Sequence, residues 1–296
     1  MRFGIPGNAH LLLKKLKEKY IKSPINYIGN KYKIIDQIIP LFPPNIRTFI
    51  DVFSGSGTVL INTNAEHYIY NDINPYVASI FKGLVSENIE IIISKIEEII
   101  KAYNLSKINK EGFEKLRDDY NSGKNDWITL YTLMCYSFNY QFRFNNNQQY
   151  NSSFGKNRSC FSDRQRLNLY AMKERINTGI TVLSENFLKM DYSKFDDYDF
   201  LYFDPPYFNS VGSYNDGKRG FEGWTESHEK ELLKLLDRLD EQGIRWALSN
   251  NLKYDNSLLE EWKNKYTIHY LNGSYKNCNY HKIDKSQDIE VLITNY

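Results

Sequence analysis

Short apolar runs alternate along the chain with longer segments whose apolar residues recur at helical spacing. In the segment 88–103, six isoleucines repeat at i, i+3 and i+4 positions, which predicts an amphipathic helix. A second helix is predicted over 225–243, from Thr225 to Gly243, and a third begins after Ser162 as its N-cap. Shorter helices are predicted at 10–20, 59–65 and 75–84, and strands at 48–53, 67–72, 181–185, 199–203, 245–250, 267–272 and 289–295.

This alternation predicts an α/β fold, in which helices cover both faces of a mostly parallel sheet. From about residue 104 to 160 the alternation breaks. Asn, Gln, Tyr and Phe dominate there, and the stretch 145–153 has neither the helical nor the strand period. We therefore expect residues 1–103 and 177–296 to build the sheet together, and residues 104–176 to form an inserted subdomain.

The composition is that of an ordinary globular protein. No apolar stretch approaches the roughly 20 residues that span a bilayer, and the apolar core of the N-terminal segment is too short for a signal peptide. Cys135, Cys160 and Cys278 have no metal-like spacing, which predicts reduced thiols and no metal site. We expect a soluble cytoplasmic protein without a membrane partner.

Basic residues gather in two blocks, although the net charge of the chain is only +2. Residues 1–33 carry a net charge of +7 and residues 140–176 carry +5, so the remainder of the chain is acidic. Two basic blocks on an acidic body favour a polyanion that binds locally. The alternative is a chance cluster of solvated lysines.

Two candidate ligand-binding motifs lie at the ends of the first two predicted strands. In the sequence DVFSGSGT at 51–58, Gly55 and Gly57 would let the backbone approach a ligand closely before a helix begins. Asp72 ends the second strand, where a carboxylate can accept both hydroxyls of a ribose. Together these motifs indicate a nucleoside cofactor. A tight turn and a solvated loop acid are the alternatives.

The sequence YFDPPYFNS at 202–210 ends another strand with a stiff loop. Pro205 and Pro206 have no N–H to donate to a sheet, so the strand has to end at Asp204. The two prolines hold Asp204 and Tyr207 close together. This loop is either a functional element or only a strand terminator.

Four motifs in order, NYIGNK (26–31), FSGSG (53–57), YND (70–72) and DPPY (204–207), resemble a known family. It is the alpha group of S-adenosylmethionine-dependent DNA adenine-N6 methyltransferases, the Dam-like or D12 class. The resemblance extends from about residue 24 to the C-terminus. It implies a methyltransferase-type seven-stranded sheet with helices on both faces, an inserted DNA-recognition subdomain, S-adenosyl-L-methionine as cofactor and double-stranded DNA as partner.

The resemblance also implies where the cofactor binds. Tyr27 and Lys31 would hold its methionine end, Asp72 would bind its ribose, and Ile73 would pack on its adenine. The full set of cofactor-binding residues that the resemblance implies is Tyr27, Lys31, Phe53, Ser54, Gly55, Gly57, Thr58, Asp72, Ile73, Asp191, Tyr192 and Asp204.

Asp204, Pro205, Pro206 and Tyr207 would then form the catalytic motif. The exocyclic amine of adenine is a poor nucleophile because its lone pair is delocalised into the ring. The Asp204 carboxylate and the Pro205 carbonyl would accept its two N–H groups, and the two prolines would make this acceptor pair rigid. Tyr207 would stack on the base once it has been extruded from the duplex.

Residues 138–155 resemble the family's DNA-reading hairpin. Arg143 would read a guanine, Phe138 would wedge into the base stack, and cations after the hairpin would bind phosphates. The implied DNA-binding residues are Phe138, Asn139, Arg143, Lys156, Asn157 and Arg158.

Phe142 and Phe144 in the same stretch are better explained as the packed core of the hairpin. GATC-type members of the family carry aliphatic and basic residues where this chain has Gln141 and Asn157. The recognition sequence is therefore left open.

The sequence thus predicts a site-specific DNA adenine-N6 methyltransferase that acts on a flipped base. It would belong to a restriction–modification system or act as a phage or orphan enzyme, with a cognate endonuclease as a functional partner rather than a stable complex. The alternatives are an RNA adenine or protein-amide methyltransferase of the same fold, and a catalytically silent DNA-binding module. Asp204 argues against a protein-amide enzyme, because such enzymes favour asparagine at this position.

Overall fold

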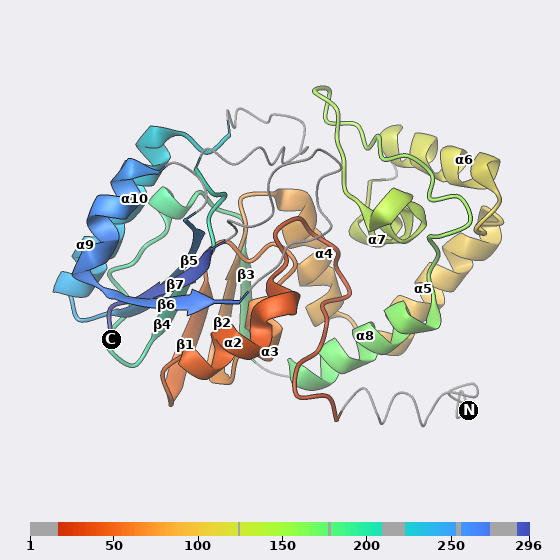
Figure 1. Ribbon diagram of the computed structural model, residues 1–296. Coiled ribbons are helices and arrows are strands. Elements are labelled where there is room, and N and C mark those ends of the chain that lie inside the picture. The colour runs from red at the N-terminus through yellow and green to blue at the C-terminus, as the bar shows by residue number, and fades with distance from the viewer. Residues whose placement is uncertain (1–16, 124, 177–178, 209–222, 253–255, 273–288) are drawn as a thin grey trace.

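The computed structural model describes residues 17–123, 125–176, 179–208, 223–252, 256–272 and 289–296. A seven-stranded sheet in the order β3-β2-β1-β4-β5-β7-β6 forms its centre (Figure 1). The five strands from β3 to β5 are parallel, and β7 runs antiparallel to β5 and β6. The strands are β1 (Ile46–Asp51), β2 (Ala65–Asn71), β3 (Ile180–Leu183), β4 (Phe200–Phe203), β5 (Arg245–Asn251), β6 (Thr267–Leu271) and β7 (Glu290–Thr294).

Helices cover both faces of this sheet, as predicted. Successive strand residues point to opposite faces. Accordingly, Phe200 and Tyr202 lie in one apolar cluster with α2, α3 and α4, while Leu201 and Phe203 lie in another with α9 and α10. The helices are α2 (Ile35–Ile38), α3 (Thr58–Asn62), α4 (Pro75–Ser86), α5 (Ile89–Ala102), α6 (Lys110–Asn121), α7 (Trp127–Tyr136), α8 (Asp163–Arg175), α9 (Glu226–Glu241) and α10 (Ser257–Trp262).

The predicted helix ends at Ser162, Thr225 and Gly243 are confirmed. The Ser162 side chain accepts the Gln165 N–H, and Thr225 forms a capping box with His228 at the start of α9. Gly243 follows α9 with φ +73°, a conformation that glycine adopts at low cost. Of the helix predicted over 10–20, only residues 17–20 are described, and they form a turn and bends instead.

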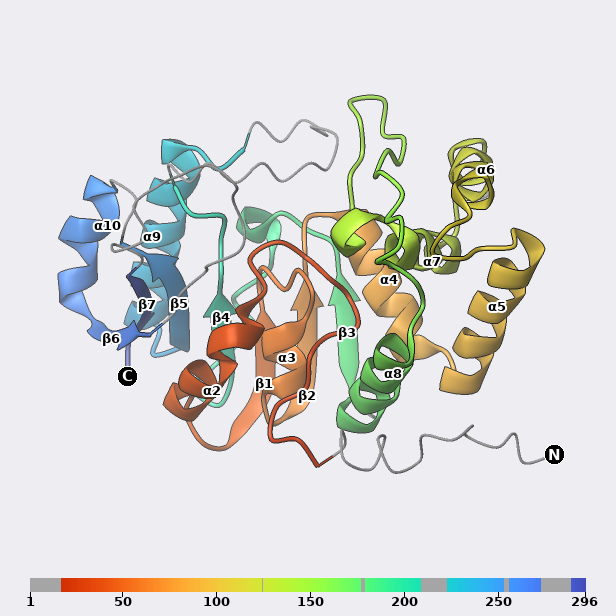
Figure 2. The same ribbon diagram turned by 45° about the vertical axis from the view of Figure 1, so that its right-hand side comes forward.

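The segment 104–162 contains two helices, α6 and α7, which the hydrophobic pattern does not predict. Nine of the ten residues of α7 are buried, so its sequence is apolar all round and shows no 3.6-residue period. α7 packs against α4, α5 and α6, beyond the β3 end of the sheet (Figures 1 and 2). The predicted boundaries of the inserted subdomain, after residue 103 and after residue 176, stay a prediction. In the described ranges, no helix is long and apolar enough to cross a bilayer.

Candidate active site

The loops after β1, β2 and β4 meet at one edge of the sheet, because the carboxyl ends of parallel strands share an edge. β4 ends at Phe203, as the two following prolines predict. β7 runs in the opposite direction, and its first residue, Glu290, pairs with Asn251 at the carboxyl end of β5. Its side chain therefore reaches the same edge as Asp204.

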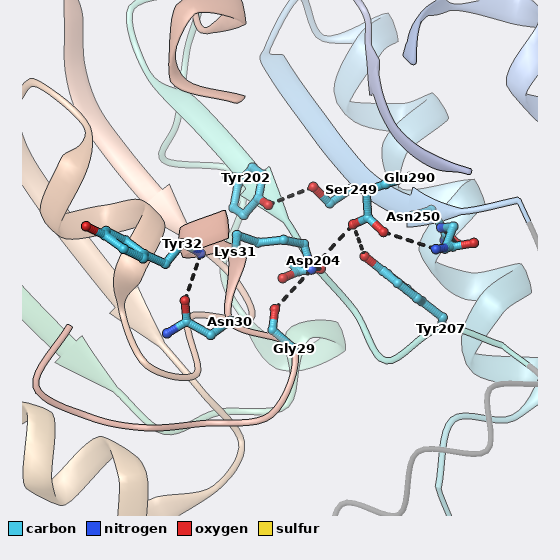
Figure 3. A network of polar contacts seen from close by, with 11 residues as sticks. Gly29, Asn30, Lys31, Tyr32, Tyr202, Asp204, Tyr207, Ser249, Asn250 and Glu290 are labelled. Carbon is cyan, nitrogen blue, oxygen red and sulfur yellow. Dashed lines mark hydrogen bonds and ion pairs between the residues drawn. The ribbon is translucent and has the colours of Figure 1, made fainter. Parts of the chain in front are cut away.

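Four side chains from distant parts of the sequence form a buried polar network at this edge (Figure 3). The Lys31 ammonium lies 2.7 Å from Asp204 Oδ1 and 3.7 Å from Glu290 Oε1. The Tyr207 hydroxyl donates to Glu290 Oε1 over 2.5 Å, and its ring centroid lies 5.1 Å from the same ammonium. Lys31, assigned to the cofactor, and Asp204, assigned to both the cofactor and the base, are thus direct partners.

The electrostatics of the network follow from two carboxylates that share one ammonium. The side chains of Lys31, Asp204 and Glu290 are 3%, 16% and 0% exposed, respectively. Burial raises the pKa of both carboxyl groups above their ordinary values, and the Lys31 ammonium opposes that rise. The ionised form of Asp204, which would accept an amine, therefore depends on Lys31.

The glycine loop after β1 and the end of β2 are joined by Asp72. Its Oδ2 accepts the Gly55 N–H over 2.9 Å, and its Oδ1 accepts the Asn74 N–H over 2.8 Å. Gly55 has φ +51°, and a Cβ built on it would lie 2.9 Å from the ring of Tyr27, so the loop requires glycine here. Tyr27, Gly55 and Asp72 thus lie together at this edge.

Asn30 was not among the predicted site residues, yet it connects Lys31 to the glycine loop. Its amide donates to Ser56 Oγ and to Thr58 Oγ1, each over 2.9 Å. Its Oδ1 accepts the Tyr32 N–H and so caps the 3₁₀-helix η1 (Lys31–Ile34). Asparagine is common at the N-cap of a helix, and this preference is the signal in the sequence that could have indicated a role for Asn30.

A buried carboxylate at the end of β1 was also missed. Asp51 is 2% exposed, and its Oδ1 has no hydrogen-bond partner among the residues that the structure describes. Burial raises its pKa well above the ordinary value, and the charges of Asp204 and Asp72 raise it further. A buried acceptor without a donor is costly, so this atom suits a cationic or N–H group of a ligand.

Other residues that the resemblance assigned to the cofactor have different surroundings. Phe53 and Tyr192 both pack against the apolar cluster that contains Phe187, and the Phe53 and Phe187 ring centroids are 5.3 Å apart. Ile73 is 45% exposed beside Asp72. The exposed Asp191 accepts the N–H and the hydroxyl of Ser193, in a local turn. Ser54 donates to the Asp51 carbonyl over 2.7 Å.

The predicted DNA-reading hairpin has two antiparallel arms held by isolated bridges, Ser137 with Phe154 and Phe144 with Tyr150. Phe144 is buried and stacks on Tyr76, with ring centroids 4.0 Å apart, which confirms its assignment to the packed core. Phe142 is partly buried against the same core.

The residues assigned to DNA are exposed. They are Phe138, Asn139, Arg143, Lys156, Asn157 and Arg158. Asn139 has φ +54°, and its carbonyl accepts the Asn26 side-chain amide over 2.8 Å. This contact connects the hairpin to the segment that carries Tyr27 and Lys31.

Comparison with known proteins gives a consistent picture. The chain is 46% identical over 298 residues to the type II methyltransferase M.FokI of Planomicrobium okeanokoites, a match that covers 99% of this chain and 46% of that protein. It is 43% identical over 285 residues to the modification methylase StsI of Streptococcus sanguinis, covering 94% and 43%. The DNA adenine methylase of Escherichia coli K12 is 22% identical over 250 residues, covering 83% and 86%. The chain spans less than half the length of the first two relatives.

The model of one family, the D12 class N6 adenine-specific DNA methyltransferases, matches residues 27–277. This range contains Lys31, the glycine loop, Asp72 and Asp204, and it ends before Glu290. Because the match covers most of the chain and every motif that meets at the sheet edge, the chain belongs to the D12 class N6 adenine-specific DNA methyltransferase family.

Proposed function

We propose that this chain transfers a methyl group from S-adenosylmethionine to N6 of an adenine in double-stranded DNA, within a restriction–modification system. The observation that carries the proposal is the position of Asp204. It begins a stiff Pro-Pro loop at the same edge as the glycine loop and Asp72, and it contacts the buried Lys31. The names of the relatives M.FokI and StsI support the biological setting.

The residues at the sheet edge fit the proposed cofactor. The Asp51 Oδ1 atom, buried without a partner among the described residues, suits its α-ammonium group. Asp72 places a carboxylate beside the glycine loop, at the end of the second strand, which suits the hydroxyls of a ribose. S-adenosylmethionine, when bound, supplies a methyl group on a positively charged sulfur, which keeps the electron pair of the broken C–S bond.

The chain's own residues would prepare the amine. The Asp204 carboxylate and the Pro205 carbonyl accept the two N–H groups, which returns electron density to N6 and directs its lone pair. N6 gains a bond to the methyl carbon and must lose one proton, which Asp204 can accept and pass to solvent. The displacement itself is mainly a matter of position, since the reacting atoms have to be in line.

The direct test is incubation of the chain with tritiated S-adenosylmethionine and duplex DNA, followed by nucleoside analysis. N6-methyladenine from duplex DNA is the expected product. Label in RNA alone, label in protein, or no label would each refute the proposal. Sequencing of DNA from cells that express the chain would then identify the recognition sequence.

Tyr207 provides a test of base extrusion. A fluorescent adenine analogue at the target position should brighten when the duplex binds, and stacking on Tyr207 should dim it again. Tyr207→Ala should leave the analogue brighter, because a base stacked on an aromatic ring is held by about 1–3 kcal/mol and is quenched. Tyr207→Phe keeps the ring and should quench more than the alanine variant. Equal fluorescence of the alanine variant and the wild type would contradict a stacking role.

Arg143 and Lys156 should differ in what they contribute to DNA binding. Both are exposed, but Arg143 lies within the hairpin and Lys156 follows it. A bidentate contact to guanine discriminates by about 1–3 kcal/mol, so Arg143→Ala should relax preference at one base pair. Lys156→Ala should weaken binding to all duplexes and reduce the slope of log K against log salt by about one.

Fluorescence anisotropy on cognate and singly substituted duplexes, at several salt concentrations, separates the two roles. Lys110→Ala is a control, since this exposed lysine on α6 pairs with Glu114. Uniform loss with Arg143→Ala, together with altered base preference for Lys156→Ala, would reverse the assignment.

A further inference from the structure

Glu290 lies in the active site although no motif of the sequence points to it. It is fully buried at the start of β7, outside the range that the family model matches. Its carboxylate accepts the Tyr207 hydroxyl over 2.5 Å and the Asn251 amide over 3.2 Å, and it lies 3.7 Å from the Lys31 ammonium. A buried carboxylate carries a large desolvation cost, so a site that retains one beside Asp204 needs a reason.

The reason lies in a competition between the target amine and the Lys31 ammonium for the Asp204 carboxylate. In the proposed reaction this carboxylate has to accept an N–H group of the target amine. In the structure, however, its Oδ1 is 2.7 Å from the Lys31 ammonium. An ammonium held that closely withdraws electron density from the acceptor and occupies one of its lone pairs. Glu290 is the second carboxylate within reach of the same ammonium (Figure 3).

We propose that Glu290 is a positioning residue: it holds Tyr207 by its hydroxyl and takes over Lys31 when Asp204 binds the target amine. This inference rests on the proposed methyl transfer. Glu290 would act through Tyr207 and Lys31, the two side chains of the network that it contacts. With Glu290 within reach, the ammonium can move away from Asp204 and still have a carboxylate partner. Glu290 also fixes the ring on which the base would stack.

The decisive variant is Glu290→Gln, which keeps the shape and one acceptor but removes the charge. Under single-turnover conditions, its methylation rate should fall about 10–100-fold, the loss expected for one hydrogen bond to a charged group. The affinity for S-adenosylhomocysteine should stay within about threefold. Asp199→Asn is the matched control. Asp199 is a buried carboxylate paired with Arg47 just before β4, at the opposite end of that strand from Asp204.

Two further readouts separate positioning from a purely structural role. Neighbouring carboxylates raise each other's pKa, as Asp204 does for Glu290. Without the Glu290 charge, Lys31 has Asp204 as its one carboxylate partner, so the pKa of Asp204 should fall. In a plot of rate against pH, the rise on the acid side should therefore move about 0.5–1 pH unit lower, while the plateau rate at higher pH falls. When Glu290→Gln is combined with Tyr207→Phe, the rate should drop no more than about twofold below the slower single variant, because one change weakens and the other removes the same hydrogen bond.

The outcomes are distinguishable. A reduced plateau, an acid limb at lower pH and non-additive losses support the role of Glu290. A Glu290→Gln rate within about twofold of the wild type overturns it, as does a slow variant with an unmoved acid limb and additive losses. If the wild type methylates no DNA, the proposed function fails, and this inference fails with it. If the wild type is active and Glu290→Gln methylates DNA at a rate within about twofold of it, only the positioning role is refuted.

Discussion

Replacement of Asp204 by alanine should lower the single-turnover rate of methyl transfer by about 10²–10³, the effect of removing one preorganised polar partner of a reacting group. The carboxylate begins the stiff Pro-Pro loop and is oriented by Lys31 at 2.7 Å. Its loss removes one of two acceptors for the amine and leaves Glu290 as the remaining carboxylate beside the Lys31 ammonium. Binding of S-adenosylhomocysteine, measured by calorimetry, should remain.

Asp204→Asn makes this prediction sharper. The amide keeps one acceptor oxygen and loses the charge, so its rate should lie between those of the wild type and the alanine variant. The control is again Asp199→Asn, at the other end of β4. That variant should lower the unfolding temperature without changing the single-turnover rate. Near-normal turnover of Asp204→Ala would refute the role of the carboxylate in accepting the amine.

Most of the sheet could be predicted because each strand is an apolar run with a polar or glycine boundary. The first strand shows the limit of this reasoning. The pattern predicts 48–53, whereas β1 is Ile46–Asp51. Val52 and Phe53 are apolar but already belong to the turn toward the glycine loop, whereas the polar Arg47 lies in the strand, where its backbone N–H donates to the Tyr198 carbonyl over 2.9 Å. Apolar character shows burial, whereas hydrogen bonding decides where a strand ends.

α7 could not be predicted for a related reason. Helical periodicity appears only when one face of a helix is exposed. α7 lies between α4, α5 and α6, and side chains around its whole circumference, such as Tyr131, Thr132 and Leu133, are buried. A buried helix of this length resembles a buried strand in its sequence. Only Asp126, which caps the helix by accepting the Ile128 and Thr129 N–H groups, marks its start.

The motifs of the candidate site could be identified, but their contacts could not. Lys31 and Asp204 are far apart in the sequence and were not predicted to contact each other, yet they form an ion pair. Glu290 and Asp51 were not predicted because Glu290 begins and Asp51 ends an apolar strand. At a strand boundary a carboxylate is an ordinary residue. Glu290 reaches the site only because β7 is antiparallel to β5. Strand direction of this kind follows from the fold and has no local signal.

Lys31→Met should reduce methylation at neutral pH by about 100-fold or more, and part of that loss should be recovered at higher pH. The variant leaves Asp204 and Glu290 as two buried carboxylates without their cation. Loss of an opposite charge raises the pKa of a carboxyl group, and two close carboxyl groups then share a proton. Burial already raises the pKa of both groups. The protonated form, which cannot accept the amine, should therefore persist to higher pH than in the wild type.

The acid limb of the single-turnover rate should thus move upward for Lys31→Met, opposite to its movement for Glu290→Gln. The test is to measure rates between about pH 5.5 and 9.5 at two S-adenosylmethionine concentrations, one that saturates the wild type and one tenfold higher. These rates separate an effect on the charge of Asp204 from an effect on cofactor binding. If Lys31 only held the methionine end of the cofactor, then more cofactor, rather than higher pH, would restore the rate.

Lys263→Met controls for the loss of a nearly buried lysine, since Lys263 pairs with Glu260 over 2.8 Å in a different part of the fold. Breaking the pair of Lys31 with Asp204 should also lower the free energy of unfolding by about 3–5 kcal/mol, because it leaves buried charge uncompensated. Denaturant unfolding measures that loss separately from the rate. An unmoved acid limb with full rescue by cofactor would show that Lys31 serves the cofactor alone and does not set the charge of Asp204.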